Sequence, residues 1–263
     1  MEAIETGQLS SSAAEVYEEF FVPALFGAWA PRLCEAARVT KDKRVLDVAC
    51  GTGSLAREAA RRGAEVVGLD RNAGMLAVAR RLAPEIDWRE GRAEDLPFGD
   101  GSFDVVASQF GLMFFEDRVK ALAEMGRVLR PGGRLVVAVW DSLEHTPGYA
   151  AMVDLLQRLL GEGIATGLRA PFVLGEPKEL RALFKAAGIF DPAIDTQAGA
   201  ARFPSIADWV RTDVKGWTLA DAIDDAQYVR LQEAAQQELK HFAAADGTVR
   251  FDSPAHIVTA VKA

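Results

Sequence analysis

The sequence predicts an α/β protein built on a doubly wound, mostly parallel β-sheet with helices on both faces. Short apolar runs, typical of buried strands, alternate with amphipathic helical stretches between residues 44 and 140. The first run ends in a glycine-rich turn, Gly51-Thr52-Gly53, and the second run ends in Asp70. In such sheets, ligands bind at the carboxyl ends of the strands. We therefore expect the functional site beside these two strand ends.

The expected elements of this core follow one another in a regular order. Strands are expected at residues 44–49, 65–69, 86–90, 103–108 and 134–140, with a last strand at 256–262. Helices are expected directly after Gly53, at residues 72–82 and at 117–129, because apolar side chains recur there at helical spacing. Pro131-Gly132-Gly133 is expected to form a turn before the fifth strand.

Helices dominate the two ends of the chain. Residues 11–37 are expected to form two helices, because Pro23 and Pro31 interrupt the apolar pattern. Further helices are expected in the second half, at residues 149–160, 177–187, 205–217 and 221–242. We expect one structural domain in three parts, which are an N-terminal helical lid (1–40), a cofactor-binding core (41–145) and a sheet-completing part with a helical substrate cap at about 203–245 (146–263).

The composition excludes several classes of protein. The chain has 263 residues, of which 49% are hydrophobic and 26% charged, as in ordinary globular proteins. A formal net charge of −8 argues against nucleic-acid binding, and no apolar run is long enough to span a membrane. The first residues lack the pattern of a signal peptide, and Cys34 and Cys50 are too few for a disulfide framework. We expect a cytoplasmic protein with a small-molecule partner, no nucleic acid and no membrane span.

The first strand and its turn indicate the kind of ligand. Asp70 follows Gly51 by 19 residues, where a carboxylate can accept both hydroxyl hydrogens of a ribose. A turn without side chains lets a ligand approach the backbone. The segment from Gly51 to Ala56 also fits the dinucleotide fingerprint G-x-G-x-x-A. However, Asp47 lies just before the turn, where a carboxylate suits a cationic ligand better than a pyrophosphate.

Further motifs lie downstream in a consistent order. They are Val45–Gly53, Asp70 with Met75-Leu76, Gly91–Phe98, Ser102–Val106 and Leu129–Arg134. In these motifs the chain resembles the class I S-adenosylmethionine-dependent methyltransferases, in particular the small-molecule group that includes the ubiquinone and menaquinone C-methyltransferases. The resemblance covers about residues 40–140. It implies a Rossmann-like, seven-stranded sheet with N-terminal helices and a helical cap insertion, and S-adenosylmethionine as the cofactor.

The resemblance also implies a role for each matching position. The residues implied to bind the cofactor are Asp47, Ala49, Gly51 and Gly53 at the methionine part, Asp70 at the ribose, Arg71, Met75, Ala93 and Glu94 at the adenine, and Gln109 and Phe110 near the reactive methyl group. The sequence departs from the family at Arg92, where relatives usually have an aspartate that binds the adenine amino group. Glu94, Asp95 or a backbone carbonyl would then take this contact. No metal site is expected.

The implied reaction is an in-line displacement of the methyl group from sulfur to an acceptor. If the acceptor needs a base, His145 is the candidate, because it follows the fifth strand on the ligand side; a solvated loop histidine is the alternative. The residues expected to bind the acceptor are Tyr17, Phe21, Met113, Phe114 and Trp140. For all of these, plain core packing is the alternative. The helices at 205–242 could close over the site or form a static cap.

Two other functions compete with methyl transfer. The first is an NAD(P)-dependent oxidoreductase on a related sheet, although no Tyr-x-x-x-Lys pair is present. The second is a non-catalytic, cofactor-binding module of the same fold. A methyltransferase acting on nucleic acid is disfavoured, because the chain has no basic stripe. The acceptor, the methylated atom and the oligomeric state stay open.

Overall fold

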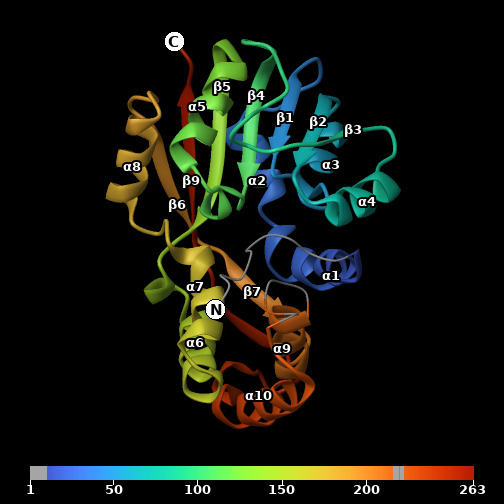
Figure 1. Ribbon diagram of the computed structural model, residues 1–263, viewed down its shortest axis with the longest axis vertical. Coiled ribbons are helices and arrows are strands. Elements are labelled where there is room, and N and C mark those ends of the chain that lie inside the picture. Colours follow the sequence, from blue (N-terminus) through green and yellow to red (C-terminus); the bar gives the residue numbers. More distant parts are fainter. Residues whose placement is uncertain (1–10, 216–218, 220–221) are drawn as a thin grey trace.

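The computed structural model describes residues 11–215, 219 and 222–263. A seven-stranded sheet forms its upper part, in the order β3-β2-β1-β4-β5-β9-β6 (Figure 1). Only β9 runs antiparallel to its neighbours in this sheet. The strands are β1 Arg44–Val48, β2 Glu65–Asp70, β3 Asp87–Glu90, β4 Phe103–Gln109, β5 Leu129–Trp140, β6 Ala193–Gln197 and β9 Ala255–Val261. The doubly wound, mostly parallel sheet is thus confirmed.

Helices cover both faces of the sheet. In Figure 1, α5 and α8 lie in front of it, and α2 lies behind. Apolar residues of these helices, such as Leu33, Leu122 and Leu180, are fully buried against the strands, which explains the amphipathic pattern in the sequence. The helices around the sheet are α2 Ala30–Ala36, α3 Ser54–Arg61, α4 Ala73–Leu82, α5 Arg118–Val128 and α8 Pro177–Ala186.

A second, mainly helical part lies below the carboxyl ends of the strands (Figure 1). A two-stranded antiparallel sheet of β7 and β8 belongs to it. Its centre is a cluster of aromatic rings, in which Trp209 is fully buried against Phe203 and Phe251. The elements of this cap are α6 Pro147–Leu160, α7 Glu162–Arg169, β7 Ala200–Phe203, α9 Ile206–Lys215, α10 Asp225–Glu238 and β8 Val249–Asp252, with the short 3-10 turns η4 Ala170–Phe172 and η5 Lys240–Phe242.

The N-terminal region differs from the two expected helices. It forms α1 Ser11–Val16, a π-helical segment η1 Tyr17–Phe26, and α2. Pro23 lies inside η1 and does not interrupt it. Proline breaks an α-helix because it lacks the N–H that bonds to the carbonyl four residues back. The segment accommodates Pro23 in a wider turn, in which the Gly27 N–H bonds to the Val22 carbonyl five residues back.

Three expectations about other elements were wrong in detail. Pro131-Gly132-Gly133 lies within the bounds of β5 as a bulge, because Leu129 pairs with Phe103 while Arg134 pairs with Val105. The helix expected at 221–242 is α10, which begins at Asp225 behind an Asp224 capping box. Strands β6, β7 and β8 and helix α7 were not expected, because they are short and lack a long apolar run. Trp217 and Asp221, ends of two expected helices, lie outside the described residues.

The strand order creates a crevice between β1 and β4. The chain continues from β1 to β2 and β3 on one side, and then returns to place β4 on the other side of β1. The helical connections therefore leave β1 and β4 in opposite directions. At such a switch point the carboxyl ends of the strands border an open space. The loops after β1 and β4 are thus placed to form a binding site.

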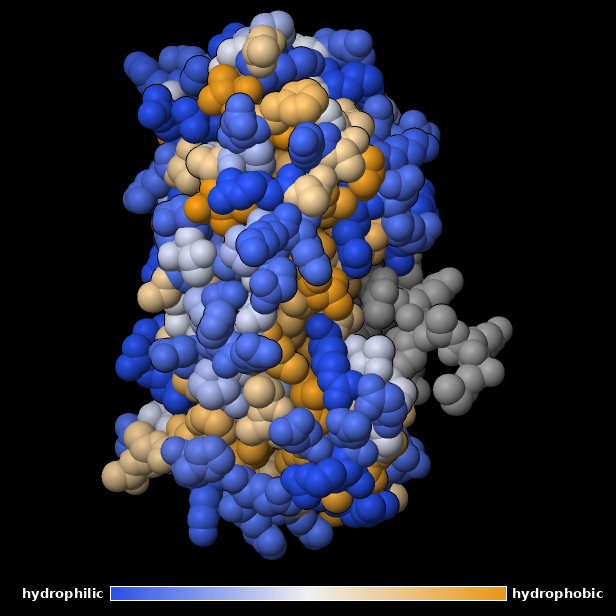
Figure 2. Space-filling view, turned by 90° about the vertical axis from the view of Figure 1, so that its left-hand side faces the viewer, coloured by the Kyte–Doolittle hydropathy of each residue, from blue (hydrophilic) through white to orange (hydrophobic). Residues whose placement is uncertain are grey.

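The face of the molecule that carries α8 is mainly hydrophilic (Figure 2). Figure 2, which views the molecule from the side of α8, shows mostly polar residues crossed by a band of apolar ones. Among the described residues, no helix combines the length and apolar character that crossing a membrane requires. The cytoplasmic location stays a prediction.

Candidate active site

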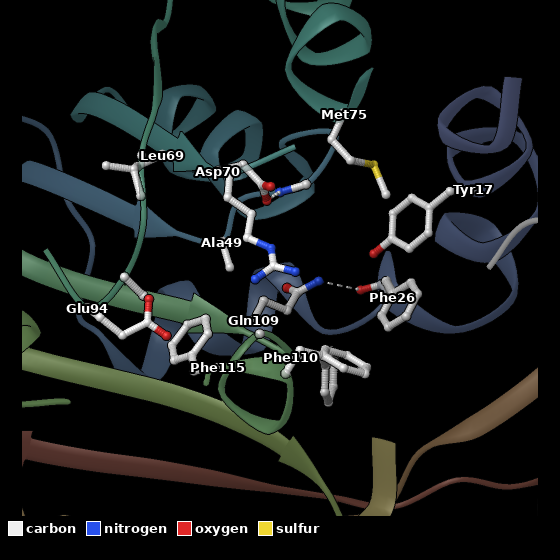
Figure 3. A pocket seen from close by; sticks show the side chains of 16 residues that line it. Tyr17, Phe26, Ala49, Leu69, Asp70, Met75, Glu94, Gln109, Phe110 and Phe115 are labelled. Atoms are coloured by element: carbon white, nitrogen blue, oxygen red, sulfur yellow. Dashed lines mark hydrogen bonds between the residues drawn. The ribbon is translucent and has the colours of Figure 1, made fainter. Parts of the chain in front are cut away.

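A cavity opens at this switch point, between the sheet and the N-terminal segment (Figure 3). It is bordered by the loops after β1, β2, β3 and β4, and by η1. The lining residues are Tyr17, Phe26, Ala49, Gly51, Leu69, Asp70, Arg71, Met75, Gly91, Ala93, Glu94, Gln109, Phe110, Gly111, Phe114 and Phe115.

Two neighbouring strands end in a left-handed backbone turn at this cavity. Ala49 has φ 58° just after β1, and Phe110 has φ 57° just after β4. Residues other than glycine rarely adopt this conformation, because Cβ approaches the carbonyl. Gly111 follows Phe110, and a Cβ on it would lie 2.7 Å from the Cβ of Ala49. The two turns therefore pack closely and bend both chains at the border of the cavity, as strained backbone at functional sites often does.

Asp70, at the end of β2, presents a carboxylate to the cavity. One oxygen accepts from the Gly51 N–H and the other from the Asn72 N–H, both at 2.8 Å. Asp70 is 9% exposed, and burial raises the pKa of its carboxyl group. An ionised carboxylate can accept about four hydrogen bonds, and the backbone of Arg71 also donates to Asp70, so the carboxylate keeps capacity for about one more. This geometry fits a hydroxyl group of a ribose.

Asp47 is buried below the glycine turn and is not among the lining residues. Its Oδ2 accepts from the Ala56 N–H in the first turn of α3, at 3.0 Å. Burial raises the pKa of Asp47 to about 8. The Ala56 N–H is one of the donors that a dinucleotide fold offers to a pyrophosphate. Because Asp47 already occupies this donor, the α3 N-terminus is poorly suited to hold phosphate.

Gly53 is also not among the lining residues. Its φ is 87°, and a Cβ on it would lie 2.3 Å from the ring of Trp88. A Cβ on Gly68 would meet the same ring at 2.3 Å. Both glycines therefore make room for Trp88, whose Nε1 donates to the Ala83 carbonyl. The structure gives Gly53 a clear packing role, and its contact with the cofactor stays a prediction.

The far end of the cavity carries a group of charged side chains. Glu94 lines it, is 9% exposed, and accepts from the Glu116 N–H at 3.0 Å. Outside it, Glu116 pairs with Arg71 and with Arg92, the residue that departs from the family pattern. Arg92 is thus engaged by Glu116 and does not line the cavity. Met75 lies on the opposite wall in Figure 3.

The wall beside η1 and β4 is aromatic. The rings of Tyr17 and Phe26 stack at 5.2 Å, and the hydroxyl of Tyr17 points into the cavity (Figure 3). Burial raises the pKa of this hydroxyl, so it is neutral near pH 7. The ring of Phe110 stacks on Trp140 at 3.8 Å, and Phe26 lies 5.6 Å from Phe110. Such a wall suits a flat, apolar ligand.

Most of the residues proposed from the sequence meet in this one cavity. Eleven of the seventeen line it, from Tyr17 at one end to Glu94 at the other. Trp140 supports it from behind through Phe110. The proposed residues outside the lining are Asp47, Gly53, Phe21, Met113, Trp140 and His145.

His145 lies in the turn η3 Leu143–His145 after β5. Its side chain is 63% exposed, and Nδ1 lies 3.1 Å from an oxygen of Asp141. This partner raises the pKa of His145. The structure thus gives the ring a carboxylate partner away from the cavity, and its role as a base stays a prediction.

Five lining residues were not proposed from the sequence. Leu69 and Gly91 belong to the ends of β2 and of β3, and Gly111 and Phe115 to the segment after β4. A closer reading of strand ends could have found these four. No sequence signal marked Phe26, because it lies far from β4 in the sequence and its contact with the end of that strand appears only in the fold.

The fold and the cavity are of the kind that binds a nucleoside-containing ligand at the carboxyl ends of the strands. Comparisons with known proteins agree. The family described as "Methyltransferase domain" matches residues 46–137. Demethylmenaquinone methyltransferase of Thermus thermophilus is 41% identical over 187 residues, which cover 62% of this chain and 83% of the relative. The enzyme of the same name from Renibacterium salmoninarum is 43% identical over 132 residues, 50% of this chain and 56% of the relative.

Solved structures support the fold. The YcgJ protein of Bacillus subtilis has a TM-score of 0.61 at 22% identity, covering 89% of this chain and 98% of that one. Haemonchus contortus phosphoethanolamine N-methyltransferase 2, solved with S-adenosylhomocysteine, has a TM-score of 0.62 at 21% identity, covering 97% of this chain and 58% of that one. The chain belongs to the class I S-adenosylmethionine-dependent methyltransferases, whose cofactor is S-adenosylmethionine. The match to the Renibacterium relative spans little more than half of that relative's length.

Proposed function

We propose that the protein transfers a methyl group from S-adenosylmethionine to a small aromatic acceptor of the hydroquinone type. The observation that carries this proposal is the cavity itself, which joins the carboxylate of Asp70 to an aromatic wall across the β1–β4 crevice. The relatives named demethylmenaquinone methyltransferase support a quinone-like acceptor.

The residues present fit the cofactor. Asp70 keeps acceptor capacity beyond its backbone donors, and Gly51 offers a backbone without a side chain. Two acidic groups, Asp70 and Glu94, line the cavity, while Arg71 is paired with Glu116. The cavity therefore favours a cationic ligand over a pyrophosphate. S-adenosylmethionine supplies an electrophilic methyl group on a sulfonium when it is bound.

The protein contributes to the reaction mainly by positioning the acceptor and by excluding water. The aromatic wall holds a flat acceptor parallel to its rings and excludes water from the reacting space. The new bond forms between the methyl carbon and the acceptor, the carbon–sulfur bond breaks, and its electron pair stays on sulfur. A hydroquinone is electron-rich and releases its own proton to solvent or to a nearby base. This step does not require His145.

Two measurements test the proposal. Titration calorimetry should detect S-adenosylhomocysteine binding in the micromolar range, with no comparable heat from NAD⁺. Transfer of a tritiated methyl group to 1,4-dihydroxynaphthalene should then be measurable under reducing conditions. Absence of S-adenosylhomocysteine binding would overturn the proposal, and binding without transfer across an aromatic acceptor panel would favour a non-catalytic module.

A further inference from the structure

Gln109 has a fixed orientation at the carboxyl end of β4. Its Nε2 donates to the backbone carbonyl of Phe26 at 3.3 Å, and Figure 3 marks this bond. A carbonyl oxygen can only accept, so it must face the NH₂ side of the carboxamide. The bond joins β4 to η1, two segments that lie 83 residues apart. The other side of the carboxamide, Oε1, is therefore directed away from Phe26.

This Oε1 lacks a donor. It is buried, and it has no hydrogen-bond partner among residues 11–215, 219 and 222–263. Buried acceptors without a partner are uncommon in proteins, because they lose their hydrogen bonds to water. Gln109 lines the cavity, so a bound ligand can supply the missing donor.

The surroundings of Gln109 indicate which ligand supplies it. Phe110 and Phe114 belong to the same segment after β4, and Phe26 and Tyr17 complete the aromatic wall around it. In Figure 3, Gln109 lies beside Phe110 and Phe26, whereas Met75 and Glu94 lie on other sides of the cavity. The carboxamide thus sits among the aromatic rings that suit the acceptor. A flat aromatic molecule against this wall would bring its edge to Oε1.

We propose that Gln109 determines acceptor specificity by accepting a hydrogen bond from a hydroxyl group on the aromatic acceptor. The site then selects a naphthol or hydroquinone over the matching ether or quinone, which has no hydrogen to donate. The bond also fixes how the ring lies in the cavity, and so which ring atom faces the methyl group. This inference rests on the proposed function, because it assumes an aromatic acceptor.

The test compares two ligands that differ by one methyl group, which replaces the hydroxyl hydrogen and so removes the donor. Binding of 1-naphthol and of 1-methoxynaphthalene is measured by calorimetry on the full chain saturated with S-adenosylhomocysteine. The wild type should prefer the naphthol by about tenfold or more, as expected for one hydrogen bond to a buried group. Gln109→Met, which keeps a similar shape without an acceptor oxygen, should bind both within about threefold.

A neighbouring control separates specificity from stability. Ser108→Ala removes a buried hydroxyl in the same strand that does not line the cavity, and it should keep the preference of the wild type. Equal binding of both ligands by the wild type would overturn the inference even if Gln109→Met fails to fold. A weaker S-adenosylhomocysteine affinity in Gln109→Met, with the naphthol preference intact, would also overturn it, by placing Oε1 at the cofactor. Failure of the wild type to bind S-adenosylhomocysteine would instead overturn the proposed function.

Discussion

The two halves of the cavity are built by different means. The half that we propose binds the cofactor comes from one stretch of chain, residues 49–94, and its groups are fixed by short hydrogen bonds to nearby backbone. The half that we propose binds the acceptor combines rings of η1 with the segment after β4, which are distant in sequence and meet through packing. The first half is therefore specified locally, whereas the second depends on the whole fold. Substitutions in the two halves should therefore have different effects on ligand binding and on stability.

Removing the acid of Asp70 should have the largest effect. In Asp70→Asn the amide has only one acceptor oxygen, so its NH₂ group must face the Gly51 or the Asn72 N–H. Loss of hydrogen bonds to a charged group should weaken S-adenosylhomocysteine binding by about 3 kcal/mol, roughly a hundredfold or more. Calorimetry measures this change. Asp87→Asn, at the exposed start of β3, is the control and should bind normally.

A loss below threefold in Asp70→Asn would contradict the ribose assignment. A large fall in the melting temperature would show that the substitution acts mainly by destabilising the turn that Asp70 holds, and not by removing a contact with the ribose. The two readings are separated by measuring affinity and thermal unfolding on the same sample.

Replacing Gly53 should lower the stability of the fold and leave the choice of ligand unchanged. In Gly53→Ala the new methyl group meets the ring of Trp88 at 2.3 Å and strains a backbone with φ 87°. Backbone strain and overpacking together should cost about 3 kcal/mol in the free energy of unfolding. Gly188→Ala, with φ 78° in the left-handed cap of α8 and no atom within 4 Å of the new methyl group, is the control for backbone strain, and it should cost about 1 kcal/mol. Urea unfolding of both variants measures the difference, and equal costs would show that Trp88 simply moves aside.

Much of the cofactor half could be predicted from the sequence. The alternation of strands and helices gave β1 to β5, because buried parallel strands are continuous apolar runs. The spacing of Gly51 and Asp70 placed both at one sheet edge, where the structure joins them by a hydrogen bond. These signals lie within short stretches of the chain, so they can be identified from a single sequence.

The acceptor half and the cap could not be predicted in the same way. Phe26 borders the cavity only because η1 packs beside β4, and nothing in its own segment shows this. Strand β6 is largely exposed at the sheet edge, so it has no apolar run to mark it. The packing role of Gly53 was not predicted, because its partner, Trp88, lies 35 residues further on. Contacts of this kind depend on packing between distant segments.

Asp47 should make stability depend on pH. Its pKa is raised from 3.8 to about 8, so at intermediate pH the group is ionised in the unfolded chain but protonated in the folded one. The unfolded state then binds fewer protons, and stability falls as pH rises through this window. Asp47→Asn lacks this titration. Relative to Asp47→Asn, the wild type should lose up to about 1.4 kcal/mol per pH unit between pH 4 and 8. Unfolding measured across this range checks the slope, and a constant difference would contradict it.

Replacing His145 should have the smallest effect on catalysis. Its ring is exposed, pairs with Asp141 and lies outside the cavity lining. His145→Ala should therefore change turnover by less than about twofold, because a base must reach the reacting proton directly or through one water. The raised pKa of His145 predicts a different signature. The ion pair stabilises the folded state below pH 6.5 and is lost as pH rises through the raised pKa, so the variant should be less stable than the wild type only in acid. A large fall in turnover with unchanged stability would instead place His145 in the acceptor half, and would require the turn after β5 to close over the cavity during the reaction.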